Sequence, residues 1–511
     1  MQTGRARLAL LLIATAAAAR VVLFGILDRR PLYGGWEGSD LQRSMFYHYG
    51  LRGHLDWTFA EQVTRDGFKP PLWFGGVPAL FGWKPSLSAL DYLLVNAAAM
   101  GGAVVIAFAL GKRLGGARGG LCAAALTAFL PGVAWRIGMV GVEPTHMVLL
   151  PAAVLALLAL LHEAEHRSLK TAAPVGVVLG VLAGAGLLLK WNFGVYLVAP
   201  ALVTLGLGLA APVATIGALL LAAAVAAALF GAWVVPFADL AEITASGVQG
   251  EVSDVGPAVF LAALREGFGP AGFGLVGLAG LGLVAGEPPR DRGLRPRRAA
   301  LVIAVTVLAL LAVHAVIPHK ESRYLLPAFP LLAALLGGPL GRIASVREGA
   351  WVAGGTLLAL AALSWVAPWS ASPRDQFAWK EVVPAPVSDD FDLERLVTHP
   401  SLQDRDRTVV TFALAGDGRW VLLTFLQWEL YGRNANPVLS RSDWDDVTSR
   451  ACAFDLERST HFVAGRALDD QEEAALRSMG FELVIRVQPR IDDVPELALW
   501  ALDPASAPRY R

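Results

Sequence analysis

The chain has 511 residues, of which 55% are hydrophobic and only 17% are charged, and its formal net charge is zero. Soluble proteins carry about 25% charged residues, so this composition excludes a disordered chain and a nucleic-acid-binding protein that relies on bulk positive charge. Two cysteines, Cys122 and Cys452, exclude a disulfide scaffold. The charge is unevenly distributed. Residues 373–511 hold 24 acidic and 16 basic residues, so the net charge of this segment is −8 and that of residues 1–372 is +8.

Apolar segments long enough to span a membrane follow one another through the first part of the chain. A spanning helix needs about 20 apolar residues, and Gly and Ala inside it let neighbouring helices approach closely. Eleven spans are predicted: 8–27, 90–110, 119–136, 144–162, 172–189, 193–211, 213–235, 268–286, 299–317, 324–341 and 350–368. The first also resembles a signal peptide, but its apolar sequence continues through Val21–Leu27 and favours a retained helix.

Basic residues gather in alternate loops, which orients the predicted bundle through the positive-inside rule. These loops contain Arg5 and Arg7, Lys112 to Arg118, Arg167 and Lys170, Arg290 to Arg298, and Arg342 and Arg347. With eleven spans they share one side if the N-terminus is cytoplasmic. The Ala-, Gly- and Arg-rich composition indicates a bacterial source. We therefore predict a multi-pass protein of the bacterial inner (plasma) membrane.

The opposite, extracytoplasmic side then carries a small soluble α/β domain, residues 371–511. Its predicted strands are Thr408–Leu414, Trp420–Phe425, His461–Gly465, Phe481–Val487 and Leu497–Leu502. Asp469 or Asp470 is predicted to cap a helix that runs to Met479 and that Gly480 ends. The region has no metal cluster, phosphate loop or nucleophile motif, so we expect it to support the protein or to select an acceptor.

The first external loop, residues 28–89, is too long to be a simple connection. Asp40 and Arg43 lie three residues apart and can share one helix face. Asp40 is a candidate base, with helix capping as the alternative. Lys69 precedes two prolines that fix the backbone, which holds this lysine near the membrane surface; an ordinary snorkelling lysine is the alternative.

Three further charged sites lie on the same side. Glu143 opens the fourth span, where it either caps the helix or faces a polar cavity. Lys190 interrupts a long apolar stretch and either belongs to a plain turn or binds phosphate. His319, Lys320 and Arg323 lie between two spans on the side where cations are disfavoured. Binding an anion would explain this last cluster, and a solvated turn is the alternative.

Together these elements resemble the C-type glycosyltransferases of the polyprenyl-phosphate-sugar-dependent superfamily. The matching elements are the acidic residue of the first loop at Asp40, the KPPL sequence Lys69–Leu72, and the RYLLP sequence Arg323–Pro327. The sequence is most similar to the protein O-mannosyltransferase and lipid A aminoarabinose transferase families, over about residues 1–370. The resemblance implies a polytopic α-helical membrane module over 1–370 with the fold of these enzymes.

The sequence departs from these families at two places in the first loop. Leu41 follows Asp40 where a paired Asp-Glu is usual, and Phe68 precedes Lys69 where aminoarabinose transferases often have Glu. No metal-ligand set is therefore predicted. Dependence on a divalent metal stays open.

The resemblance also implies a reaction. The donor is a sugar on a polyprenyl monophosphate, and the acceptor is a hydroxyl of a lipid, a glycan or a protein. Asp40 would act as the general base in an inverting displacement, and Glu143 would orient the sugar or the acceptor. The candidates for binding the donor phosphate are Arg43, Lys69 and Arg323, then Lys190, His319 and Lys320.

Two alternatives belong to other classes of protein. A transporter or flippase of a lipid-linked or anionic substrate also has many spans, but it places charges in broken helices near the bilayer centre. A structural or polymer-binding membrane protein has no use for the set of Asp40, Lys69 and Arg323. Membrane lipids are expected partners of the chain, and nucleic acid is not.

Overall fold

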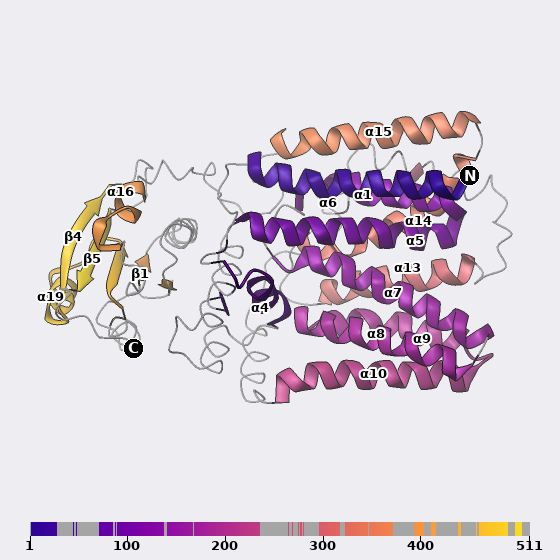
Figure 1. Ribbon diagram of the computed structural model, residues 1–511, viewed down its shortest axis with the longest axis horizontal. Helices are drawn as coiled ribbons and strands as arrows, with labels where there is room; N and C mark the ends of the chain where they lie inside the picture. Colours follow the sequence, from indigo (N-terminus) through magenta and orange to yellow (C-terminus); the bar gives the residue numbers. More distant parts are fainter. Residues whose placement is uncertain are drawn as a thin grey trace.

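In the computed structural model, a bundle of long helices and a small β-sheet lie at opposite ends of the longest axis (Figure 1). The amino terminus lies at the end of the bundle that is farther from the sheet. The structure describes residues 2–27, 71–84, 89–136, 141–166, 168–235, 296–316, 322–345, 347–370, 393–402, 410–414, 438–440, 459–488 and 496–502. It also describes the isolated positions 44, 47, 48, 87, 264, 268, 274, 276, 277, 279, 280 and 456.

Long helices run side by side through the bundle (Figure 1). They are α1 (Gln2–Leu27), α5 (Ala89–Phe129), α7 (Glu143–His166), α8 (Leu169–Leu189), α9 (Phe193–Leu207), α10 (Pro212–Val234), α13 (Pro296–Val316), α14 (Ala328–Ile343) and α15 (Arg347–Ser370), with the short α6 (Pro131–Arg136). Among the described residues, six helices are long and apolar enough to cross a membrane, and three shorter apolar helices accompany them. The predicted fold class, a polytopic helical membrane protein with a C-terminal sheet, is confirmed. Most of the predicted span 268–286 lies outside the described residues.

Helix α5 is a helical hairpin rather than one straight helix. Gly115 and Gly116 leave the helical conformation, and Gly116 has a φ of 66°, which glycine adopts without strain. A Cβ added at Gly111 would lie 2.6 Å from the Cβ of Ala123. Twelve residues of straight helix would separate these positions by about 18 Å, so the two halves run antiparallel. The hairpin corresponds to the two separate spans predicted at 90–110 and 119–136.

Small residues set the distance between neighbouring helices. A Cβ at Gly176 or Gly180 of α8 would lie 2.5 or 2.6 Å from the carbonyl oxygen of Ala218 or Ala222 of α10. The backbones of α8 and α10 therefore touch along a row of glycine and alanine, as is typical of helix pairs in lipid.

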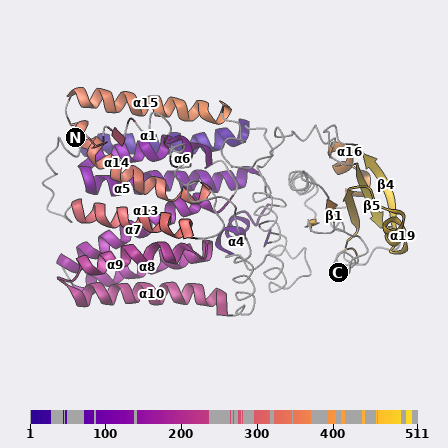
Figure 2. The ribbon, with the colours of Figure 1, turned by 180° about the vertical axis from the view of Figure 1, so that it is seen from behind.

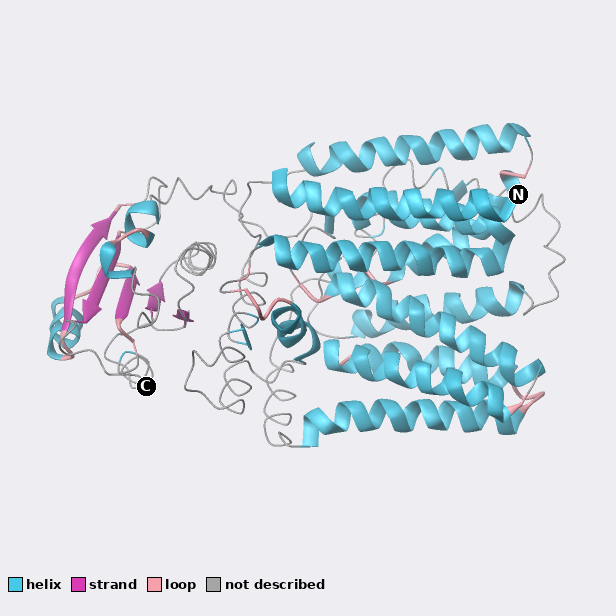
Figure 3. Cartoon of the chain, in the orientation of Figure 1, coloured by secondary structure: helices cyan, strands magenta, loops and turns pink. Residues whose placement is uncertain are grey.

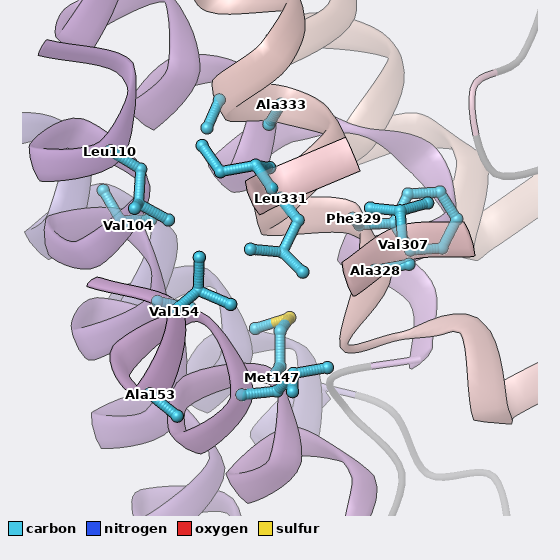
Figure 4. Packing of buried hydrophobic residues seen from close by; sticks show 14 of the residues in the cluster. Val104, Leu110, Met147, Ala153, Val154, Val307, Ala328, Phe329, Leu331 and Ala333 are labelled. Carbon is cyan, nitrogen blue, oxygen red and sulfur yellow. The ribbon is translucent and has the colours of Figure 1, made fainter. Parts of the chain in front are cut away.

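The bundle core joins helices that are distant in sequence. Val104 of α5, Met147 of α7, Val307 of α13 and Leu331 of α14 belong to one buried cluster (Figure 4). Helix α4 (Pro71–Leu80) lies between this bundle and the sheet when the molecule is seen from either side (Figures 1 and 2). It begins within the KPPL sequence, at the second proline, as expected for a residue suited to the first helical turn.

Figure 3 draws the strands of the C-terminal sheet in magenta. Among the described residues the sheet has five strands, in the order β2-β1-β3-β5-β4. The strands are β1 (Val410–Leu414), β2 (Val438–Ser440), β3 (His461–Gly465), β4 (Phe481–Val487) and β5 (Leu497–Leu502). Strand β1 pairs in parallel with β2 and β3, whereas β5 pairs antiparallel with β3 and β4. Helix α19 (Asp470–Ser478) precedes β4, and the short α16 (Leu393–Val397) and η5 (Pro400–Leu402) precede β1.

Most of the strand predictions in this region are confirmed. The observed β3, β4 and β5 have the predicted bounds, and β1 begins two residues later than predicted. The cap of α19 is Asp469, and Gly480 ends the helix with a φ of 90°. The predicted strand Trp420–Phe425 lies outside the described residues, and β2 was not predicted.

Candidate functional site

Glu143 and Lys190, predicted separately from the sequence, form an ion pair in the bundle. Lys190 Nζ lies 3.2 Å from Glu143 Oε1, and the side chains are 21% and 6% exposed. Glu143 is the first residue of α7, and Lys190 directly follows the last residue of α8. The amino end of a helix favours a negative charge and the carboxyl end favours a positive one, so both helices stabilise this pair.

The chain around Lys190 is a tight hairpin between α8 and α9. The Lys190 backbone N–H donates to the Gly186 carbonyl at 2.8 Å, and the Phe193 N–H donates to the Lys190 carbonyl at 3.0 Å. A side chain at Gly186 would overlap the ring of Phe193, so glycine is required there. The turn predicted as one interpretation of Lys190 is therefore present, and its lysine also contacts Glu143.

Lys190 makes a second contact, with the aromatic ring of Tyr324. Its Nζ lies 3.6 Å from the ring centroid, which is a cation–π geometry. Tyr324 belongs to the 3-10 helix η2 (Ser322–Leu325), and the backbone of Arg323 lies in the same turn. The buried residues Leu325 and Leu326 anchor this turn in the bundle core. The structure thus brings the RYLLP sequence to Lys190.

A set of buried aromatic and histidine side chains continues inward from this ring. His314, in the last turn of α13, stacks on Tyr324 with centroids 4.9 Å apart and an angle of 21° between the rings. Its Nε2 lies 2.7 Å from the hydroxyl oxygen of Tyr196 in α9. His146, one helical turn after Glu143, packs against Phe193 at 5.2 Å. Four helices and η2 therefore meet at one polar site.

Helix α4 approaches the same site. Its residues Trp73 and Phe74 share a buried cluster with Val142 and Leu189, which immediately precede Glu143 and Lys190. The start of α4, which contains Pro71 and Leu72 of the KPPL sequence, is thus close in the fold to the ion pair. Lys84 follows α4 and lies 2.5 Å from the buried Asp91 at the start of α5, which joins the two elements.

The other predicted site residues cannot be compared with this arrangement. Asp40, Arg43, Lys69, His319 and Lys320 lie outside the described residues, as does the side chain of Arg323. Within the described part of the chain, no three His, Cys, Asp or Glu side chains gather as metal ligands do. The described site is an ammonium between a carboxylate and an aromatic face. A partly exposed cation fixed in this way is suited to binding an anion.

Comparisons with known proteins identify the fold. No protein-family model matches the sequence, and no curated protein matches it. Among solved structures, the chain is similar to ArnT from Cupriavidus metallidurans in the apo state, with a TM-score of 0.62 and 16% identity over 98% of this chain and 99% of that one. The chain has the C-type glycosyltransferase fold.

Two further structures belong to this comparison. ArnT from Cupriavidus metallidurans bound to undecaprenyl phosphate gives a TM-score of 0.61 and 17% identity, over 98% of this chain and 99% of that chain. A mutant of the arabinofuranosyltransferase AftD from Mycobacteria gives a TM-score of 0.50 and 15% identity, over 96% of this chain but only 41% of that chain. The fold and the apolar helices together make this chain a multi-pass membrane protein.

Sequence reasoning missed the histidines and tyrosines of the site. His146 follows Glu143 by three residues, so both lie on one helix face, and this spacing could have revealed it. His314 is an ionisable residue inside a predicted span, which is by itself a signal of function. Tyr324 lies within the RYLLP sequence, but its contact with Lys190 could not be read from that motif. Tyr196 gave no signal, because its importance depends on which helices are neighbours.

Proposed function

We propose that the chain is an integral membrane glycosyltransferase that moves a sugar from a polyprenyl-monophosphate donor to an acceptor hydroxyl. The chain belongs, in this proposal, to the bacterial inner membrane, with the N-terminus in the cytoplasm. Residues 1–370 form the catalytic membrane module, and residues 371–511 form a soluble domain on the extracytoplasmic side, where transfer takes place.

One observation carries this proposal: Lys190 is fixed between Glu143 and Tyr324, beside the RYLLP sequence, in a fold shared with ArnT. One of the similar ArnT structures is bound to undecaprenyl phosphate, a lipid monophosphate. A positively charged group held at a bundle end suits the phosphate of such a lipid, whose tail would lie along the helices.

The proposed reaction is a direct displacement at the anomeric carbon. Asp40 takes the proton of the acceptor hydroxyl as its oxygen attacks, the bond from the anomeric carbon to the phosphate oxygen breaks, and the configuration inverts. The phosphate gains negative charge as it leaves. Lys190 and Arg323 stabilise that charge, together with Arg43 and Lys69; His319 and Lys320 are secondary candidates.

Glu143 has two connected roles in this proposal. Its carboxylate orients the Lys190 ammonium, which it contacts at 3.2 Å. The same carboxylate, at the amino end of α7, is our candidate for orienting the sugar or the acceptor. Both roles require a charged oxygen at this position, so Glu143→Gln should impair transfer more than its small change in shape suggests.

The experiment is sugar transfer by the purified full-length protein in lipid, using a panel of radiolabelled polyprenyl-phosphate hexoses and pentoses. Asp40→Asn should lower kcat by at least about 10²-fold, the lower end of what a general base contributes. Asp470→Asn, a matched change on an exposed residue of α19, should leave kcat unchanged. Equal activity of Asp40→Asn and the unmodified protein would exclude Asp40 as the base.

The same preparation distinguishes the enzyme from a transporter. Failure to transfer sugar from every donor, together with failure to bind polyprenyl phosphate, would contradict the proposed function. Movement of a lipid-linked sugar across the bilayer without transfer would favour the transporter or flippase.

A further inference from the structure

Tyr196 and His314 form a hydrogen-bonded pair inside the bundle. The hydroxyl oxygen of Tyr196 lies 2.7 Å from Nε2 of His314. Both residues are 1% exposed. They come from α9 and α13, so the bond joins two helices at the inner side of the candidate site.

This pair reaches Lys190 through the ring of Tyr324. The imidazole of His314 stacks almost flat on that ring, and the Lys190 ammonium lies 3.6 Å from its centroid. A cation–π contact depends on where the cation lies over the ring, so it changes when the ring tilts. Stacking on His314 sets that tilt, and the bond to Tyr196 limits rotation of the imidazole.

The remaining contacts of this group come from α7. Glu143 contacts the Lys190 ammonium. His146, one turn later, packs on Phe193 and lies edge to face with Tyr196, with the two ring centroids 6.5 Å apart. Helix α7 thus contacts both the outer and the inner part of the group. The position of the ammonium is fixed by a closed set of contacts rather than by Glu143 alone.

We infer that Tyr196 and His314 are positioning residues, which hold the Tyr324 ring and through it keep the Lys190 ammonium at one point. The catalytic consequence of this inference rests on the proposed function. A charge that is fixed before the reaction stabilises the developing charge of a leaving phosphate without having to reorganise. If the ammonium is no longer held at one point, kcat should fall and the donor KM should stay largely unchanged.

A purely structural role predicts something different. If the hydrogen bond only satisfies two buried polar groups, its removal weakens the fold but does not change the surroundings of Lys190. The decisive readout is therefore Lys190 itself. Its rate of reductive methylation by formaldehyde with cyanoborohydride as the reductant, followed by mass spectrometry, reports how well the amine is shielded. Lys84, 28% exposed and paired with Asp91, is the internal reference.

The test compares Tyr196→Phe with Thr306→Val in the full chain in lipid nanodiscs. Thr306 is a matched control because it is buried in α13, and its hydroxyl donates to Val302 of the same helix at 2.8 Å. Tyr196→Phe should raise the labelling rate of Lys190 several-fold and leave Lys84 unchanged. Thr306→Val should change the labelling rate of neither lysine.

The transfer assay adds a second arm. Tyr196→Phe should lower kcat about tenfold, because a shift of about 1 Å in a catalytic group costs up to 10²-fold. In a Lys190→Met background it should have no further effect, since residues that act through one group are non-additive. A further tenfold loss in that background would contradict the inference.

His314 offers a rescue test. The planar side-chain amide of His314→Gln can still hydrogen-bond to Tyr196 and lie against the Tyr324 ring, so it should restore most of the shielding of Lys190 that His314→Ala removes. Equal labelling in these two variants, or unchanged labelling in Tyr196→Phe, would overturn the inference whatever reaction the protein catalyses. Raised labelling in a protein that neither transfers sugar nor binds polyprenyl phosphate would support the positioning contact and contradict the proposed function instead.

Discussion

Two ion pairs in this chain have almost the same exposure but very different surroundings. In the bundle, Lys190 and Glu143 are 21% and 6% exposed. In the C-terminal domain, Arg466 and Glu472 are 20% and 6% exposed. The first pair joins residues 47 positions apart, whereas the second spans only six positions.

The difference lies in what each pair supports. Glu472 also accepts from the backbone N–H of Asp469 at 3.2 Å, so the domain pair belongs to the cap of α19 and has a complete local explanation. In the bundle pair, the cation contacts the aromatic ring of Tyr324, which comes from a distant part of the chain. An ion pair that joins distant segments beside an aromatic ring is a better candidate for function than one that belongs to a helix cap.

The largest expected effect tests this distinction directly. Lys190→Met should lower kcat for sugar transfer by about 10²–10³-fold, the loss that follows removal of one group stabilising charge in a transition state. Arg466→Met should leave kcat within about twofold, because distant sites act independently. Both variants are compared as folded protein in lipid, with radiolabelled donor. Equal losses in the two would show that the bundle pair is not functionally special.

A smaller effect is expected on the stability of the domain. Arg466→Met removes the cation that pairs with the buried Glu472 carboxylate. This loss should lower the free energy of unfolding of the domain by about 1–3 kcal/mol. Hydrogen exchange of the β3 and α19 amides in the full chain measures this loss. Lys190→Met should not change exchange in β3, and faster exchange there would mean that the two regions are coupled.

The features that could be predicted from the sequence depend on local contacts, and those that could not be predicted depend on contacts between distant residues. Asp469, Gly480 and the ends of β3 and β4 could be predicted, because each depends on residues within a few positions. Strand β2 is only three residues long and depends on pairing with β1, so its own sequence carried little signal.

In the bundle, sequence reasoning found the charges but not their arrangement. Glu143 and Lys190 were predicted because each interrupts or opens an apolar span. Their contact could not be predicted, because apolar periodicity does not say which helices are neighbours. The role of Tyr196 could not be predicted for the same reason, because it depends on the packing of α9 beside α13.

The pH dependence of the domain gives a third, intermediate effect. Burial lowers the pKa of His461 from 6.5 to about 4; nearby His399 lowers it further, and a hydrogen bond that the imidazole donates to the Ser401 backbone opposes the shift. Between these values the unfolded chain binds more protons, so domain stability should fall as the pH drops from 6.5 toward 4, by up to about 1.4 kcal/mol per pH unit. Exchange of the β3 amides at pH 7 and pH 5 measures this, and His461→Phe should remove much of the difference.

The smallest effect concerns the cap that explains the domain pair. The Asp469 side chain accepts from the Glu472 N–H at 2.8 Å, and replacing such a cap by alanine costs about 1 kcal/mol. Asp469→Ala should therefore speed exchange in the first turn of α19 by about fivefold and leave transfer unchanged. Because Glu472 also binds Arg466, the double variant Asp469→Ala/Arg466→Met should lose less stability than the two single losses would give if they added. Strict additivity would mean that the cap and the ion pair are independent, and the local explanation of the domain pair would fail.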